Sequence, residues 1–289
     1  MHLLHSVVSK GANLQTHTPV TNISNDPLPD GRWLVTTERG SLKAKKVILA
    51  TNGYTAGVAP QFKDHIVPVR GICGRIHVPS TQGSKTKQAP YLPNTYGIRY
   101  GPGLYDYLIP RNDGSIIVGG AKQTWWHEKE HWYNVTDDST LVEPAIKEFD
   151  NLMQKRFIGW EDSGAEVDRI WTGSKLPPLL DPVYAMLKLH IADYPHMLVV
   201  MGYTNDSMPY IGHIPGKPGQ MVIAGFNGHG MPLILLAAKA VAEMLQEGKA
   251  FEETGVPSLF KVTQERLDNT HNIILDPTPL TNGKETGNL

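Results

Sequence analysis

A glycine-rich turn between an apolar strand and a long apolar helix is the first feature of the sequence that could do chemistry. Residues 221–225 predict a strand, Gly225, Gly228 and Gly230 follow it, and Pro232 stands at the start of a helix over 231–246. The first turn of a helix has unpaired N–H groups and a partial positive charge. It can therefore hold a phosphate or another electron-rich group. A tight strand-to-helix crossover without a ligand is the alternative.

A second candidate is the segment His127-Glu128-Lys129-Glu130-His131, which matches the HExxH pattern. In zinc hydrolases of this pattern, two histidines one helical turn apart bind the metal and the glutamate activates water. The charged residues inside the motif, and the lack of a third ligand at the expected spacings, favour a solvated connection between a sheet and a helix. We therefore expect no metal site here and keep a zinc hydrolase as a remote alternative.

Arg70 and Arg111 are the two basic residues that could bind the carboxylate of a substrate. A guanidinium forms two parallel hydrogen bonds with a carboxylate, which both binds and orients it. Each arginine could instead pair with an acidic side chain of the protein. Paired carboxylates such as Asp137-Asp138 are typical of helix starts, and no catalytic acid or base is assigned.

Composition limits the classes of protein. The 289 residues include 27 Lys and Arg and 28 Asp and Glu, and 40% are hydrophobic. This composition is typical of a globular protein and does not favour a nucleic-acid binder, which needs excess positive charge. The single cysteine, Cys73, excludes an internal disulfide. The longest apolar run, 231–245, is too short to cross a bilayer and no signal peptide is visible, so we expect an intracellular, cytoplasmic protein without membrane contact.

Hydrophobic patterns place these residues on two kinds of sheet. Residues 47–50 form a short apolar run, typical of a strand buried on both faces in a parallel sheet. Alternating runs separated by Gly and Pro predict an antiparallel sheet between Ile66 and Gly120. We also expect a strand over 14–23, a hairpin strand over 33–37, and helices over 1–10 and 138–156.

Four motifs resemble the C-terminal part of the FAD-dependent oxidoreductases of the D-amino-acid oxidase, glycine oxidase and sarcosine oxidase type, in particular a fungal branch. Each motif alone is weak, whereas their order and spacing together are specific. The motifs are Gly11 to Ile23, Val47 to Thr55 with Pro68 to Gly71, Tyr107 to Gly114 with Val118 to Ala121, and Asp206 to Gly216 with Gly225 to Met231.

The resemblance implies roles for individual residues. The backbone at Val20 would meet the adenine of FAD, and the turn Ala50-Thr51-Asn52-Gly53 would close over the dinucleotide. The segment from Gly225 through Phe226, Asn227, Gly228, His229 and Gly230 to Met231 would lie against the isoalloxazine, with N–H groups facing its N1/O2 edge. Such proteins oxidise an amine C–N bond and pass the hydride to FAD.

Two departures from the family pattern affect the expected activity. The family begins with a βαβ unit that carries GxGxxG, and no GxGxxG occurs in these 289 residues. We therefore expect weak FAD binding or none by this chain alone, as in a truncated form. Residues 174–200 separate the segment Trp171-Thr172-Gly173 from Met201 as an anomalous insertion. It is either a surface excursion or a translated intron.

The sequence predicts an α/β (α+β) fold. It consists of an incomplete FAD-binding Rossmann-like domain, residues 1–62 and 201–250, and an antiparallel-sheet substrate domain, residues 63–172, with a loose tail over 269–289. The predicted function is FAD-dependent oxidation of a small-molecule amine or amino acid. The alternative is a non-catalytic remnant, or a fragment that needs a separate nucleotide-binding segment.

Overall fold

The computed structural model describes residues 2–79, 87–172 and 200–275. The chain divides into two compact units, which we call the terminal unit, His2–Pro68 with Met201–Leu289, and the central unit, Val69–Val200. The terminal unit is thus built from two distant stretches of sequence. The expected insertion at 174–200 lies outside the described residues except for Val200.

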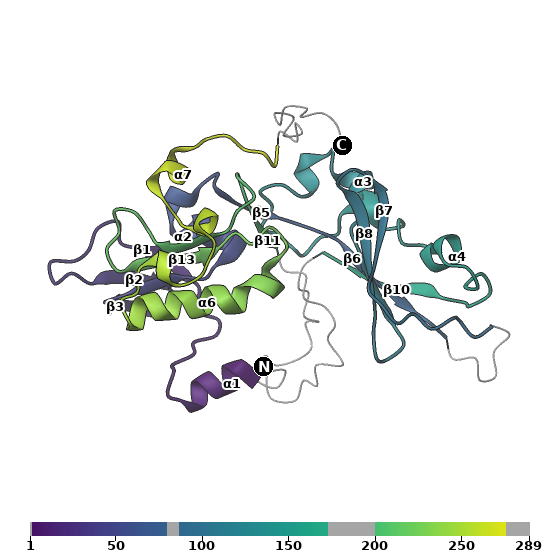
Figure 1. Cartoon of the computed structure of the whole chain (residues 1–289), viewed down its shortest axis with the longest axis horizontal. Coiled ribbons are helices and arrows are strands. Elements are labelled where there is room, and N and C mark those ends of the chain that lie inside the picture. Colours follow the sequence, from purple (N-terminus) through teal and green to yellow (C-terminus); the bar gives the residue numbers. More distant parts are fainter. Residues whose placement is uncertain (1, 80–86, 173–199, 276–289) are drawn as a thin grey trace, which may run out of the picture. The chain divides into compact units, whose positions relative to one another are not determined.

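Two three-stranded sheets form the terminal unit (Figure 1). In one sheet, β1 (Val20–Ile23), β2 (Trp33–Thr37) and β3 (Gly40–Ala44) are antiparallel neighbours. In the other, β13 (Gln220–Ala224) is central, parallel to β4 (Val47–Leu49) and antiparallel to β12 (Tyr210–His213).

Helices of the terminal unit connect and cover these strands. The long helix α6 (Gly230–Gln246) packs on β12 and β13. It follows β13 directly, as expected for a strand-to-helix crossover. The other elements of this unit are α1 (His2–Ser9), η1 (Asn52–Tyr54), α2 (Thr55–Val58), η2 (Pro60–Phe62), η6 (Phe251–Glu253), η7 (Ser258–Phe260), α7 (Gln264–Asp268) and the pair β5 (Ile66–Val69) and β11 (Met201–Thr204).

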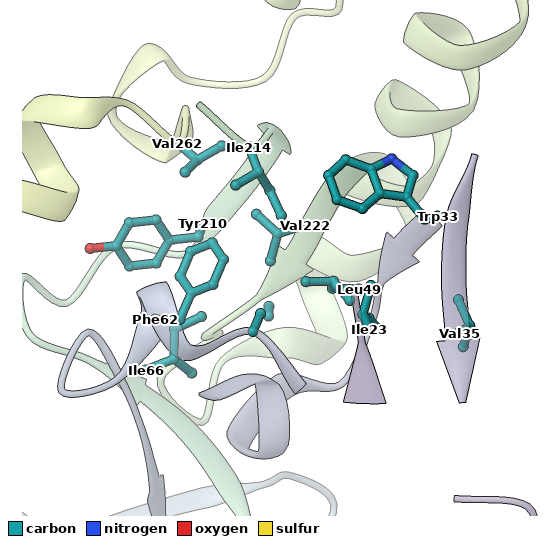
Figure 2. Close-up of a cluster of buried hydrophobic side chains, with 12 residues drawn as sticks. Ile23, Trp33, Val35, Leu49, Phe62, Ile66, Tyr210, Ile214, Val222 and Val262 are labelled. Carbon is teal, nitrogen blue, oxygen red and sulfur yellow. The ribbon is translucent and has the colours of Figure 1, made fainter. Parts of the chain in front are cut away.

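One apolar cluster holds the terminal unit together (Figure 2). It joins side chains from both stretches of the sequence, so that folding of residues before Pro68 depends on residues after Met201. Trp33 is fully buried in it and donates its indole N–H to the carbonyl oxygen of Pro218 at 2.9 Å. The labelled side chains are Ile23, Trp33, Val35, Leu49, Phe62, Ile66, Tyr210, Ile214, Val222 and Val262.

The central unit contains a five-stranded antiparallel sheet, as the sequence predicts. Its strand order is β10-β6-β9-β8-β7. Short helical pieces lie between and after its strands in the chain; one of them, α3, follows β9 and contacts β8. The elements are β6 (Cys73–His77), β7 (Tyr96–Gly101), β8 (Leu104–Pro110), β9 (Ile116–Gly119), α3 (Lys122–Trp125), η3 (Lys129–His131), η4 (Glu143–Ala145), α4 (Leu152–Arg156) and β10 (Glu166–Trp171).

Three expected elements differ in the structure. The helix expected over 138–156 is two short pieces, η4 and α4, because Pro144 lacks an N–H and Asn151 has a left-handed backbone with φ of 54°. The strand expected over 14–23 begins only at Val20, directly after Pro19. Strand β4 is not buried on both faces: Leu49 is buried, whereas Ile48, which points to the opposite face, is 47% exposed.

The tail expected to be loose from residue 269 is ordered at first. Asn205 donates its side-chain amide to the carbonyl oxygens of Asn269, at 2.9 Å, and His271, at 3.1 Å. The N–H of Ile273 donates to the carbonyl oxygen of Asn205 at 2.9 Å. These bonds hold residues 269–275 against the loop that follows β11. Residues 276–289 lie outside the described part.

Candidate functional site

Asn52 joins the turn after β4 to the end of β13. Its side-chain oxygen accepts hydrogen bonds from the N–H groups of Gly225, at 3.0 Å, and Phe226, at 3.4 Å. Asn52 has a φ of 43°, a left-handed conformation that asparagine tolerates better than most residues. The parallel pairing of β4 with β13 brings these two strand ends to the same edge. The structure thus brings together two segments that the sequence assigns to cofactor binding.

Two glycines let the backbones of η1 and β11 touch. A Cβ atom on Gly53 would lie 2.9 Å from the carbonyl oxygen of Met201. A Cβ atom on Gly202 would lie 2.6 Å from the side-chain oxygen of Asn52 and 2.8 Å from the backbone nitrogen of Gly53. Contacts below 3.0 Å exclude any side chain unless the backbone shifts, so both positions require glycine.

Asn227 fixes the glycine-rich turn against β11. Its side-chain oxygen accepts the N–H of Thr204 at 2.8 Å, and its own N–H donates to the carbonyl oxygen of Gly202 at 2.8 Å. Its side-chain amide donates to the carbonyl oxygen of Gly225 at 2.8 Å. Asn227 and Gly228 both have positive φ, 53° and 78°. The turn therefore has one defined conformation, set by backbone and amide contacts.

The N-terminal end of α6 follows this turn. His229 is the residue before the helix, and no described side chain caps that end. The His229 ring nitrogen Nδ1 lies 2.9 Å from the carbonyl oxygen of Asn227, so the ring folds back on the turn. Met231 is 92% exposed. The N–H groups of the first turn are consequently available to an electron-rich group. The positive end of the helix dipole lies at the same place and favours negative charge there.

The remaining residues expected to bind the cofactor, Ala50, Thr51 and Val20, lie near η1 and α2. Ala50 and Thr51 are exposed between β4 and η1. The hydroxyl groups of Thr51 and Thr55 share a hydrogen bond at 2.9 Å. Val20 begins β1, which packs against α2, the helix that follows Gly53 in the chain. Val20 is 38% exposed, which leaves it accessible to a ligand.

Strand β11 is part of the candidate site, although none of the sequence motifs above assigns it there. Besides Gly202 and Thr204, it brings Met201 and Tyr203 next to the turn: a Cβ atom on Gly228 would lie 3.3 Å from the Met201 sulfur and 3.5 Å from the Tyr203 hydroxyl oxygen. One feature of the sequence does indicate this role of β11: Gly202 lies inside an apolar strand, and a glycine in a strand often marks a close approach of two backbones.

Arg70 does not fit the role of a substrate clamp. It is 5% exposed, and its guanidinium donates to the carbonyl oxygens of His131, at 2.9 Å, Asp137, at 3.0 Å, and Thr140, at 3.3 Å. The Thr140 hydroxyl accepts a fourth bond at 2.8 Å. Burial lowers the pKa of Arg70. Through these contacts Arg70 stabilises the loop over 131–140. Arg111, by contrast, lines a cavity of the central unit.

The HExxH segment does not have the geometry of a zinc site. Its residues Lys129–His131 form a 3₁₀ turn, so the two histidines do not share the face of an α-helix. Glu128 lies between them, with carboxylate oxygens 3.2 Å from His127 Nε2 and 2.7 Å from His131 Nε2. Among the described residues, no group of three His, Cys, Asp or Glu side chains is placed to hold a metal ion.

Comparison with known proteins decides the family. The sequence matches the family described as DAO, FAD dependent oxidoreductase, over residues 1–244, most of the chain. The chain belongs to this family. The resemblance of the four motifs to FAD-dependent oxidoreductases of this type is thereby confirmed, and so is the mixed helix-and-sheet fold class. The family is FAD dependent, which fits the open helix end and the glycine backbone contacts described above.

Individual relatives agree with this assignment. The chain is 24% identical over 242 residues to a probable oxidoreductase OrdL of Rhizobium meliloti (strain 1021), and the match covers 84% of this chain and 44% of that protein. The fold is similar to that of glycine oxidase from Geobacillus kaustophilus, with a TM-score of 0.61, 18% identity, and coverage of 91% of this chain and 56% of that one. L-proline dehydrogenase from P. horikoshii gives a TM-score of 0.55 and 19% identity, covering 85% and 54%. The chain thus spans about half the length of the relatives it matches.

Among the helices that the structure describes, none combines the length and the apolar character that a membrane span requires. The longest, α6, has 17 residues.

Proposed function

We propose that this DAO family member oxidises the C–N bond of a small amine or amino acid, with FAD as hydride acceptor. The observation that carries the proposal is the bond from the Gly225 N–H to the Asn52 side chain, which fixes the end of β13 and the start of the glycine-rich turn against η1. The names of the structural relatives, an oxidase of glycine and a dehydrogenase of proline, support an amine or amino-acid substrate.

The residues of the terminal unit fit the cofactor. Gly53 and Gly202 bring their backbones together at the η1 turn, where the dinucleotide would lie, next to Val20, Ala50 and Thr51. Gly228, His229, Gly230 and Met231 would face the flavin ring with the N-terminal end of α6. When bound, FAD supplies the electron sink for the hydride removed from the carbon next to nitrogen.

The protein's own contribution is electrostatic and positional. The first-turn N–H groups of α6 and the positive end of its dipole would stabilise negative charge on the pyrimidine edge of a bound flavin. Asn227 holds the turn that presents these groups, through its bonds to Thr204 and Gly202. Because these donors are fixed before the reaction, little reorganisation is needed when charge develops.

FAD binding by this chain alone is weak in our proposal, because the printed sequence has no GxGxxG loop to hold the pyrophosphate. The test is reconstitution: the purified chain is mixed with excess FAD, dialysed, and its absorbance spectrum measured. A stoichiometric yellow chromophore would disprove the weak binding. Reduction of the bound flavin by an amine or amino acid, followed without oxygen, tests the proposed reaction itself.

A second candidate is favoured by apolar exposure in the terminal unit. Met231, Leu235 and Leu236 on α6 are 92%, 73% and 66% exposed, and Ile48 lies on the edge strand β4. Such a surface favours a chain that acts together with a separate nucleotide-binding segment. Flavin content measured with and without a co-expressed GxGxxG-containing segment tests this second candidate, which predicts a strong increase; no increase would contradict it.

A further inference from the structure

A cavity of about 590 Å³ opens in the central unit beside the hairpin turn between β8 and β9. One wall is that turn, residues 110–112 with Gly114, and the other is the extended segment 91–95. Both walls come from the central unit and lie outside the glycine-rich site of the terminal unit. The volume is in the range of small-molecule sites.

The chemistry of the walls favours an anion. Arg111 is the one charged side chain among the described residues that line the cavity, and no Asp or Glu lines it. The cavity is also lined by Asn94, Thr95, Asn112 and Tyr91, whose side chains can donate hydrogen bonds. Tyr91 is 86% exposed and stands at the rim. A cation with neutral donors around it attracts a negatively charged group rather than a cationic or apolar one.

The guanidinium of Arg111 is incompletely paired. Its Nε is buried and has no hydrogen-bond partner, and the nearest carboxylate oxygen, Asp113 Oδ2, is 3.6 Å away. Ser115 fixes the position of the Asp113 carboxylate: its N–H and hydroxyl donate to Asp113 Oδ1 at 3.0 and 2.6 Å. The ion pair between Arg111 and Asp113 is longer than a hydrogen bond and the Arg111 side chain is 25% exposed, so the charge of its guanidinium remains available to an anion in the cavity.

We propose that this cavity binds a small carboxylate-bearing ligand, with Arg111 as the cationic clamp and the amides of Asn94 and Asn112 as additional donors. Two sources of that carboxylate are possible: the amine substrate itself, or a separate organic acid. The binding step needs neither FAD nor turnover, so this proposal does not rest on the proposed function and its failure would leave that function untouched.

The experiment is a calorimetric titration of the full 289-residue chain with malonate and with succinate at low ionic strength, where charge interactions are least screened. Saturable binding is expected. Arg111→Gln should weaken it at least about tenfold, the effect of losing a charge-assisted pair, and Arg111→Lys less. Arg99→Gln is the matched control, because Arg99 is an exposed arginine on β7 of the same unit and does not line the cavity.

Two outcomes overturn the proposal: no saturable binding to the wild-type chain, or equal affinity in the wild-type and Arg111→Gln chains. If Arg111→Gln fails to fold by circular dichroism, the double variant Asn94→Ala, Asn112→Ala takes its place and must weaken binding. Competition with glycine separates the sources. Displacement of malonate by glycine identifies the site as one for a carboxylated amine, and its absence identifies a separate organic acid; both results presuppose the site.

Discussion

The side-chain oxygen of Asn52 accepts the N–H of Gly225, a residue 173 positions further along the chain. The same oxygen lies 3.4 Å from the nitrogen of Phe226. One amide therefore satisfies donors at the end of β13 and fixes the turn that leads to α6. Because the contact spans the two stretches of the terminal unit, it links the stability of that unit to the shape of the candidate cofactor site.

Replacing Asn52 should therefore affect both properties. Asn52→Ala leaves the Gly225 N–H without its acceptor and places alanine at positive φ, so we expect a loss of about 1–3 kcal/mol in the free energy of unfolding. Urea unfolding measures this loss. Asn52→Asp is the control, since it keeps an acceptor oxygen and tolerates a left-handed backbone. Equal stability of Asn52→Ala and the wild type would show that the bond contributes nothing.

Gly225 should tolerate no side chain, for two separable reasons. A Cβ atom there would lie 2.3 Å from Thr204 Cγ2, and the φ of 78° is unfavourable for any other residue. We expect Gly225→Ala to cost about 2–4 kcal/mol, from overpacking and backbone strain together. Thermal or urea unfolding of the variant measures the sum.

Two further variants separate the two causes. Thr204→Ser removes Cγ2 and keeps the hydroxyl, so in the double variant the overpacking should largely disappear while the strain remains. Gly255→Ala reports the strain alone, because Gly255 has a similar φ of 74° with open space around its Cβ position. If Thr204→Ser gave no rescue, the steric contact would not be the cause.

The sequence allowed the site to be predicted where local chemistry decides the structure. Glycines followed by Pro232 predict a turn and a helix start, and alternating apolar residues predict the antiparallel sheet; both are found. The contribution of β11 could not be predicted in this way, because Gly202 matters through contacts with residues distant in the sequence, such as Asn52, 150 positions away. Arg70 illustrates the same limit: its type suits a carboxylate, yet the fold surrounds it with carbonyl oxygens.

The ion pair between Arg75 and Asp168 should make stability depend on pH. Arg75, on β6, donates Nε to Asp168 Oδ1 at 2.9 Å and Nη2 to Asp168 Oδ2, and these hydrogen bonds lower the pKa of Asp168 from its usual 3.8. A lowered pKa in the folded protein contributes stability above the unfolded value, which is lost as the pH falls through the folded value. Arg75→Gln should therefore cost about 1 kcal/mol near pH 7, since both groups are partly exposed.

The pH profile is the decisive part of that measurement. The difference between the wild type and Arg75→Gln should be constant from pH 7 to about pH 5 and shrink as the pH falls below 3.8. Asp168→Asn should remove the pH-dependent difference. A difference that instead persisted unchanged below pH 3 would mean that Arg75 acts through packing rather than through the carboxylate.

Cys73 should be unreactive in the folded protein. Its thiol is 1% exposed, its sulfur lies 2.7 Å from the Tyr107 hydroxyl oxygen, and burial raises its pKa to about 12. At pH 8 the thiolate fraction is then about 10⁻⁴, compared with roughly a quarter for an ordinary cysteine, and only the thiolate is nucleophilic. A thiol reagent should label the native chain at least about a thousand times more slowly than a free cysteine.

Unfolding supplies the comparison within the same molecule. In guanidinium chloride the reagent should label one thiol per chain, since Cys73 is the single cysteine. Tyr107→Phe is the matched variant. It keeps the ring that packs on Cys73 and removes only the hydrogen bond to the thiol; that bond, when present, lowers the thiol pKa. Protection should persist in that variant, because burial is the larger cause. Rapid stoichiometric labelling of the native wild-type chain would show instead that the sheet around Cys73 opens readily.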